Sequence, residues 1–91
     1  MTDARPLYSV YIVQCADGSL YCGIAIDVNV RIAQHNGGTR GARYTKSRRP
    51  VRLVYCETCG SRSDALKHEI RIKKLSRAEK ERLIEGARVA A

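Results

Sequence analysis

The sequence predicts an α+β domain, with a small three-stranded antiparallel sheet flanked by helices. Two neighbouring β-rich segments joined by a hairpin turn, a third β-branched segment, and capping patterns typical of helix starts support this prediction. The expected order along the chain is β-β-α-β-α-α. We expect residues 1–91 to form one domain with a core over about residues 8–85, since a chain of this length rarely holds two.

The first two strands are predicted at residues 8–15 and 20–24, where β-branched and aromatic residues predominate. Between them, Ala16-Asp17-Gly18-Ser19 is a strong hairpin signal, because Asp and Gly favour tight turns. The third strand is predicted at residues 51–55, directly after Pro50.

The length of the hairpin turn decides whether Tyr11 and Tyr21 share a face of the sheet. A two-residue turn would point them to opposite faces, because side chains alternate along a strand. A three-residue turn with a left-handed glycine shifts the register by one, and Tyr11 then lies opposite Gly23 and Tyr21 opposite Val13. Both turns are chemically acceptable, and we expect the second because a shared site requires it. Gly23 would then leave the space above the Tyr11 ring open.

Helices are predicted from their capping residues. Asp27 is a suitable N-cap for a helix over residues 28–36, which the glycines at 37 and 38 would end. Capping-box patterns at Ser61–Asp64 and Ser76–Glu79 start two further helices, ending near residue 74 and near residues 86–88. Residues 37–50 contain three glycines, one proline and no hydrophobic period, so they are predicted to form a loop.

The charge balance favours a polyanionic partner. There are 17 Lys and Arg residues against 9 Asp and Glu, a formal net charge of +8 and a pI of about 9.7. Such an excess on a small domain favours nucleic acid, whether DNA or RNA, or an anionic membrane face, and we expect nucleic acid. The sequence contains no run of about 18 apolar residues, so no membrane span is predicted. The first residues lack the apolar core of a secretory signal peptide. We therefore expect a cytoplasmic location; the sequence leaves the oligomeric state open.

Two predicted helices carry charged groups beside their apolar residues. On the helix over residues 28–36, Val28, Ile32 and Ala33 form an apolar stripe. Arg31 and His35 lie one turn apart at its margin, and together they would present two proton-donating groups to one point. An ordinary surface pair is the alternative.

Glu69 is the more unusual residue. It falls within the apolar arc of the helix that starts at Ser61, and an unpaired carboxylate there would be costly. Lys73, one turn later, offers an ion pair. A divalent cation is the other solution, because Mg²⁺ is often held by a single carboxylate, several waters and a substrate phosphate. The arc itself consists of Ala65, Leu66, Ile70 and Ile72.

The predicted loop is strongly basic: between residues 37 and 52 there are six Lys and Arg residues and no acid. Tyr44 lies among them and would be available for stacking on a base. The predicted nucleic-acid contacts are Arg40, Arg43, Tyr44, Lys46, Arg48 and Arg49. Arg52, the sixth cation, lies in the predicted third strand.

Taken together, these residues resemble the GIY-YIG nuclease superfamily, and closely its small stand-alone bacterial members, over about residues 8–83. Val10-Tyr11-Ile12 corresponds to the first family motif and Tyr21-Cys22-Gly23 to the second. Val10 stands where the family has Gly, and Cys22 replaces the middle residue of the second motif. The further matching positions are Arg31, His35 and Glu69.

The resemblance implies an endonuclease that hydrolyses DNA with one divalent cation and leaves 5′-phosphate and 3′-hydroxyl ends. It implies that Glu69 holds Mg²⁺ or Mn²⁺ and that Tyr11 is the general base. Arg31 would bind the scissile phosphate, while Tyr21 and His35 would orient water or phosphate. We therefore expect the two phenols and the guanidinium to converge on the Glu69 carboxylate. A domain this small has little surface for reading bases, so selectivity for DNA structure or for single strands is expected.

Two alternatives remain open from the sequence. The first is a nucleic-acid-binding module of the same fold with weak catalysis, in which Glu69 pairs with Lys73. The second, less favoured, is a zinc or thiol module built on Cys56 and Cys59, whose partners would have to be Cys15 and Cys22. The six residues between that second pair are not zinc-knuckle spacing.

Overall fold

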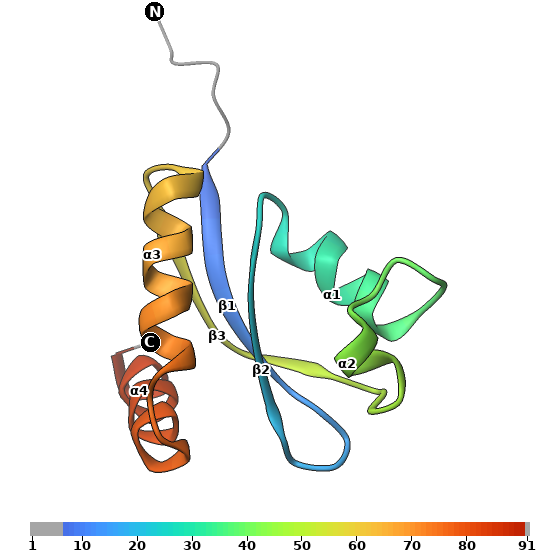
Figure 1. Ribbon diagram of the computed structural model, residues 1–91. Helices are drawn as coiled ribbons and strands as arrows, with labels where there is room; N and C mark the ends of the chain where they lie inside the picture. The colour runs from blue at the N-terminus through green and yellow to red at the C-terminus, as the bar shows by residue number, and fades with distance from the viewer. Residues whose placement is uncertain (1–6, 91) are drawn as a thin grey trace, which may run out of the picture.

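The computed structural model describes the backbone of residues 7–90 and the side chains of residues 7–87. Strands and helices follow in the predicted order, with one additional short helix (Figure 1). The elements are β1 (Tyr8–Gln14), β2 (Leu20–Ala25), α1 (Val28–Asn36), α2 (Arg43–Lys46), β3 (Arg52–Cys59), α3 (Arg62–Lys73) and α4 (Arg77–Ala90).

The strands form one antiparallel sheet in the order β2-β1-β3, which confirms the predicted α+β class. The hairpin turn is the longer of the two possibilities: Gly18 has φ +86°, and its N–H donates to the Cys15 carbonyl at 2.9 Å. Tyr11 consequently pairs with Gly23, and Val13 pairs with Tyr21. Turn chemistry thus sets the register, because the left-handed glycine adds the third turn residue.

The third strand is longer than predicted. It extends to Cys59, four residues beyond the predicted end, and Cys59 pairs with Tyr8 at the start of β1. Residues 56–59 are mostly exposed because β3 is an edge strand, and they lack the apolar pattern by which the first half was predicted. Cys56 and Cys59 are therefore strand residues, one exposed and one buried, rather than a metal-binding turn.

Residues 43–46, predicted as loop, form the single helical turn α2. Four residues are too few to show a hydrophobic period, which is why the sequence pattern missed it. The turn is held by Thr45, a fully buried residue whose hydroxyl donates to the Ala42 carbonyl at 2.9 Å.

The predicted caps are present. The Asp27 carboxylate accepts a hydrogen bond from the Val30 N–H at the start of α1. The Ser61 hydroxyl accepts from the Asp64 N–H at the start of α3. α4 starts with a full capping box, because Ser76 and Glu79 exchange two side chain–backbone hydrogen bonds.

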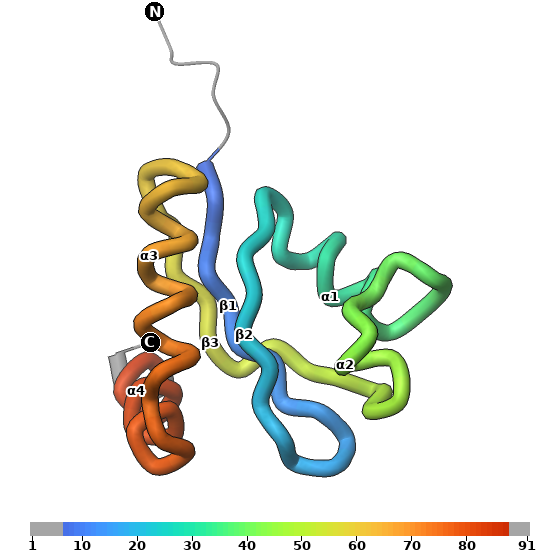
Figure 2. The backbone as a smooth tube through the Cα atoms, viewed as in Figure 1, coloured from blue at the N-terminus to red at the C-terminus, as the bar shows by residue number. Residues whose placement is uncertain are grey.

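The sheet separates two apolar clusters. On one face Val10 and Ile12 pack with Ala65, Ile72 and other residues of the α3 side. On the other face Tyr11 and Val13 pack with Val28 and Ile32 of α1, among other residues. Figure 1 and the backbone trace in Figure 2 show the same layers, with α3 and α1 on opposite sides of the sheet and β2 at its edge. No helix in the described part of the chain is both long and apolar enough for a bilayer.

Candidate active site

Tyr11 lies at the centre of the α1 face. It is 1% exposed, and its ring covers Gly23 on the neighbouring strand. A Cβ atom on residue 23 would lie 2.6 Å from the Tyr11 hydroxyl oxygen. The expectation of open space above the ring is therefore wrong: Gly23 makes room for the phenol itself, which reaches across β2.

A chain of buried hydrogen bonds runs from Tyr11 into α2. The Tyr11 hydroxyl lies 2.7 Å from His35 Nε2, and His35 Nδ1 lies 2.9 Å from the Thr45 hydroxyl. Because Thr45 donates its single proton to Ala42, it must accept from His35, which assigns the proton to Nδ1. Tyr11 then donates to the unprotonated Nε2. The weaker 3.4 Å approach of the Ala42 N–H to Nδ1 does not change this assignment.

Arg31 is the cation of this cluster. Its Nη1 atom donates to the Gln34 side chain at 3.0 Å and to the Arg40 carbonyl at 2.7 Å, which fixes the guanidinium beside the Tyr11 phenol. The contact between the two side chains favours the phenolate form of Tyr11. α1 thus brings Arg31 and His35 to the same phenol, one turn apart as their spacing requires.

Burial has the largest effect on the pKa values of both Tyr11 and His35. Desolvation, partly offset by Arg31, raises the pKa of Tyr11 to about 12. Desolvation, with the charges of Arg31 and Arg49, lowers the pKa of His35 to about 4. His35 is 0% exposed rather than marginal, and it is neutral near pH 7. The expectation of two proton-donating groups at one point is therefore wrong for His35, because a buried imidazole beside two guanidinium groups resists protonation.

The neutral His35 predicts a pH dependence of stability. Its folded pKa of about 4 lies below the ordinary value of 6.5, so the unfolded chain binds the proton more tightly. The resulting stabilisation is fully present above pH 6.5 and is lost as the pH falls from 6.5 to 4, by about 3 kcal/mol. Urea unfolding at pH 7 and pH 4.5 measures the loss. A His35→Gln variant is expected to lose much less over that interval, and an equal loss would contradict the assignment.

Tyr21, Tyr44 and Arg48 form a stack beside this cluster. The Tyr21 ring packs edge-on against His35, with ring centroids 5.4 Å apart, and stacks on Tyr44 at 5.8 Å. Arg48 lies 3.9 Å from the Tyr44 ring centroid, and its Nε bonds the Asp17 carboxylate at 3.1 Å. The hairpin turn, β2 and α2 are thereby joined through side chains.

The basic segment divides into exposed cations and cations that hold the fold. Arg49 donates to the His35 and Gly38 carbonyls at 2.6 and 2.9 Å, so its guanidinium closes the loop onto α1. The loop is closed further where the Asn36 amide pairs with the N–H and C=O of Val51. Arg48 is engaged by Asp17. The remaining predicted contacts are exposed: Arg40, Arg43, Lys46 and, in part, Tyr44.

Glu69 lies on the other face of the sheet, within α3. Ala65 and Ile72 on either side of it are buried, but Ile70 is 54% exposed and does not belong to the apolar arc. The Glu69 carboxylate lies 3.6 Å from the Lys73 ammonium. The expected direct convergence of Tyr11, Tyr21 and Arg31 on Glu69 is not seen, because strand alternation points both phenols to the α1 face while α3 covers the opposite one.

The two faces meet around the edge strand. Cys22 lies between Tyr21 and Gly23 in sequence but points to the α3 side, where burial and, second to it, the charge of Glu69 raise the pKa of its thiol. A pocket of about 170 Å³ beside β2 is lined by Tyr21 and Tyr44 as well as by Lys73. It connects the phenol cluster to the helix that carries Glu69.

A family model described as the GIY-YIG catalytic domain matches residues 7–82. The chain belongs to the GIY-YIG family. This places it in a family of endonucleases, which generally depend on a divalent metal and act on nucleic acid.

Sequence relatives agree with this membership. The UPF0213 protein DP2720 of Desulfotalea psychrophila is 55% identical over 83 residues, which are 91% of this chain and 76% of that protein. The UPF0213 protein SERP0126 of Staphylococcus epidermidis is 57% identical over 76 residues, 84% of this chain and 92% of that protein.

Solved structures agree on the fold. The solution NMR structure of the UPF0213 protein BH0048 from Bacillus halodurans is 43% identical, covers 87% of this chain and 83% of its own, and has a TM-score of 0.57. That of the protein EF2693 from E. faecalis is 30% identical, covers 97% of this chain and 93% of its own, and has a TM-score of 0.61.

Within this GIY-YIG domain, sequence reasoning missed two kinds of residue. Thr45 gave no signal, because its role depends on the packing of α2 against His35. Lys80 lies outside the basic segment, on a helix distant in sequence, and lines the pocket beside β2. A charge pattern along one helix does not reveal which neighbouring element it will face.

Proposed function

We propose that this protein is a metal-dependent endonuclease that hydrolyses phosphodiester bonds in DNA and favours single-stranded or branched substrates. The observation that carries the proposal is the buried chain Tyr11–His35–Thr45 with the half-buried Arg31 at its Tyr11 end, beside a pocket at the edge of the sheet of a GIY-YIG domain. A tyrosine with a purely structural role would need neither a glycine opposite it, which leaves room for its hydroxyl, nor a cation beside that hydroxyl.

Tyr11 is the proposed general base for the attacking water. Its raised pKa of about 12 keeps the phenol protonated near pH 7, so Tyr11 can take the proton of the attacking water only as its own proton passes to the unprotonated Nε2 of His35. Arg31 is the group of this chain that favours the phenolate, and His35 Nε2 accepts the phenolic hydrogen bond. Arg31 also binds the scissile phosphate and the charge that develops on it. Tyr21 and His35 hold the phenol and the phosphate in place.

The residues present could hold a divalent cation in an open site, where the protein supplies few of the ligands. Within the described residues, no cluster of three or more His, Cys, Asp or Glu side chains encloses a metal. The half-buried Glu69 carboxylate supplies one hard oxygen ligand, and Mg²⁺ or Mn²⁺ accepts such a site when water and a substrate phosphate complete it. When bound there, the cation would stabilise the negative charge of the leaving oxygen.

The test is a cleavage panel with single strands, duplexes, flaps and junctions of DNA, and single-stranded RNA for comparison. We expect nicking of at least one DNA form in Mg²⁺ or Mn²⁺ and none in EDTA. Inactivity of a well-folded protein on every DNA form, with either metal, would contradict the proposal.

Tyr11→Phe removes the proposed base and keeps the ring that fills the core. We expect cleavage to fall about 10²–10³-fold, the usual range for loss of a positioned acid or base. Tyr55→Phe is the matched control, because this hydroxyl bonds Glu57 outside the proposed site. Comparable rates for Tyr11→Phe and wild type would assign proton removal to another group.

A nucleic-acid-binding module with weak catalysis is the second candidate. It is favoured by one observation: Glu69 has an ion-pair partner in Lys73 and lies across the sheet from the phenols. Such a module would bind DNA in EDTA and in Mg²⁺ with similar affinity and release no cleaved product.

A further inference from the structure

The pocket beside β2 is basic on the side formed by α3 and α4. Lys73 from α3 and Lys80 from α4 both line it, and no carboxylate does. The two ammonium groups lie close enough to Cys22, at the pocket wall, for each to lower the pKa of its thiol. Two cations from different helices therefore face one small hollow.

The remaining lining is neutral. Burial raises the pKa of the Cys22 thiol to about 11, so it adds no negative charge near pH 7. Ile12 and Ile72 contribute apolar surface. No carboxylate within residues 7–87 pairs with the Lys80 ammonium, whereas Lys73 pairs with Glu69 and keeps further N–H donors, since an ammonium has three. Glu69 lies behind the lining, close enough to Lys73 and Cys22 to offset part of this charge, so Lys80 is the lining cation without an acidic partner in the described residues.

The opposite side of the pocket is aromatic. Tyr21 and Tyr44 line it with stacked rings, 23° from parallel, and Tyr44 is 39% exposed. Tyr21 stacks on the Tyr44 ring and the Arg48 guanidinium lies over it, so an entering strand would meet the exposed edge of Tyr44. Aromatic side chains beside cations are a common arrangement in proteins that hold single-stranded nucleic acid. At about 170 Å³ the pocket is smaller than the ~300–1,000 Å³ that encloses a drug-sized ligand, so it suits one phosphate with its sugar.

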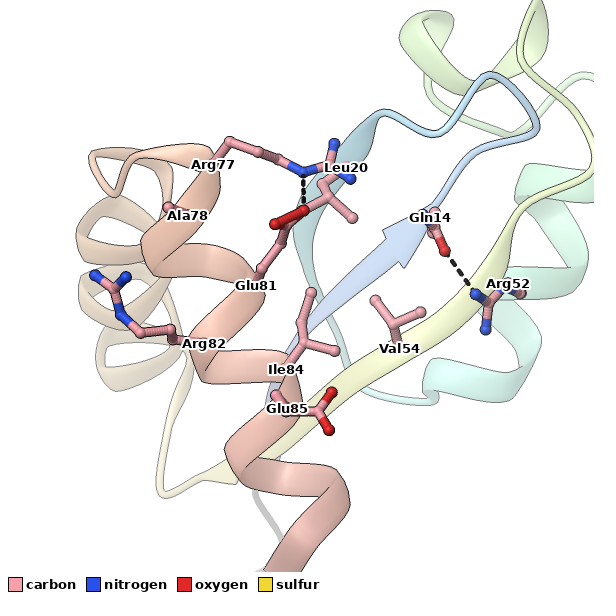
Figure 3. A pocket seen from close by; sticks show the side chains of 10 residues that line it. All are labelled: Gln14, Leu20, Arg52, Val54, Arg77, Ala78, Glu81, Arg82, Ile84 and Glu85. Carbon is pink, nitrogen blue, oxygen red and sulfur yellow. Dashed lines mark hydrogen bonds and ion pairs between the residues drawn. The ribbon is translucent and has the colours of Figure 1, made fainter.

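A larger pocket, of about 570 Å³, lies farther along α4 and is a poor anion site (Figure 3). Two of its three lining arginines are engaged, and Arg82 is the third. Arg77 pairs with Glu81 and donates to the Gly18 carbonyl, and Arg52 donates to Gln14. The carboxylates of Glu81 and Glu85 belong to its lining, so they offset its positive charge.

We propose that Lys73 and Lys80 bind one backbone phosphate of a single nucleic-acid strand, with the adjoining nucleoside against the aromatic side of the pocket, which Tyr21 and Tyr44 form. This site rests on the proposed function, because the strand it holds is the substrate. Arg40, Arg43 and Lys46 then contact the strand from the α2 side of β2, and the two lysines from the α3–α4 side. The strand crosses the edge of the sheet between Tyr11 and Glu69.

The test measures binding without cleavage. A fluorescein-labelled single-stranded DNA oligonucleotide is titrated in EDTA, over a range of salt concentrations, with wild type, Lys73→Gln, Lys80→Gln and Lys80→Arg. Lys74→Gln is the charge-matched control, an exposed lysine at the end of α3 outside the pocket lining. Each pocket variant to Gln is expected to weaken binding about fivefold near 0.1 M salt and to reduce the salt slope by about 0.3, because the two lysines share one phosphate contact, which is worth about 0.7 on a single strand. Lys80→Arg restores both, and Lys74→Gln changes Kd less than twofold.

The outcomes separate this site from the proposed function. If wild type binds the strand and both pocket variants match Lys74→Gln in affinity and slope, the two-lysine site is wrong and the endonuclease proposal stands. If wild type binds neither single-stranded nor duplex DNA, the proposed function itself fails. Equal thermal unfolding midpoints for all variants show that any loss of binding comes from the missing charge.

Discussion

Glu69→Gln is expected to reduce Mg²⁺-dependent cleavage of DNA about 10³-fold. The amide keeps the size of the carboxylate but loses the charge that would hold a divalent cation, and such stabilisation is worth several kcal/mol. Fold stability is expected to change little, because the Lys73 ion pair it breaks is worth about 0.3–0.5 kcal/mol on a helix surface. Rates are measured on the DNA form that wild type cleaves best.

Two companion measurements sharpen this result. DNA binding by Glu69→Gln in EDTA is expected to be at least as tight as that of wild type, since the carboxylate is not a phosphate ligand and its loss frees Lys73. Glu57→Gln, an exposed carboxylate on β3, serves as the control and should cleave normally. Wild-type cleavage rates for Glu69→Gln would show that Glu69 is the structural partner of Lys73 and no more.

Gly23→Ala is expected to be the most damaging small substitution in the sheet. The added Cβ would lie 2.6 Å from the hydroxyl oxygen and 2.8 Å from Cζ of Tyr11. The ring is enclosed and bonded to His35, so it has no room to retreat without breaking that bond. We expect a loss of about 2 kcal/mol in unfolding free energy, typical of overpacking, and about a 10²-fold loss of cleavage from the displaced phenol.

Gly86→Ala is the matched control, because no atom lies within 4 Å of a Cβ at that position in α4. It should stabilise the protein by about 0.5–1 kcal/mol through helix propensity. Urea unfolding of both variants gives opposite signs if the packing is as described. A Gly23→Ala protein as stable and as active as wild type would mean that the Tyr11 hydroxyl does not occupy this space.

Local chemistry limits the hairpin to two acceptable turns, and the expectation that Tyr11 and Tyr21 share a face chooses between them. One left-handed glycine sets the turn, and the turn then fixes which residues face each other along β1 and β2. The helix caps at Asp27, Ser61 and Ser76 were predictable from local chemistry alone. Each is a side chain that bonds a backbone N–H at most three residues away.

What the sequence left out depends on contacts between distant segments. The second half of β3 is a strand because β1 pairs with it, although its own residues look like loop. His35 is buried because α2 folds over it, and that turn exists because Thr45 bonds inward. Lys73 and Lys80 face one pocket through the angle between two helices, which no spacing rule on either helix encodes.

The segment between α1 and β3 leaves and rejoins the fold at almost the same point. The Asn36 amide bridges the backbone of Val51, and Arg49 donates to the His35 carbonyl in the last turn of α1. Because the ends are already joined, lengthening the tip near Thr39 would cost little closure entropy. That exposed tip is thus the position at which a fluorophore, an affinity tag or a tethered targeting domain could be added while the buried tyrosine–histidine pair stays intact.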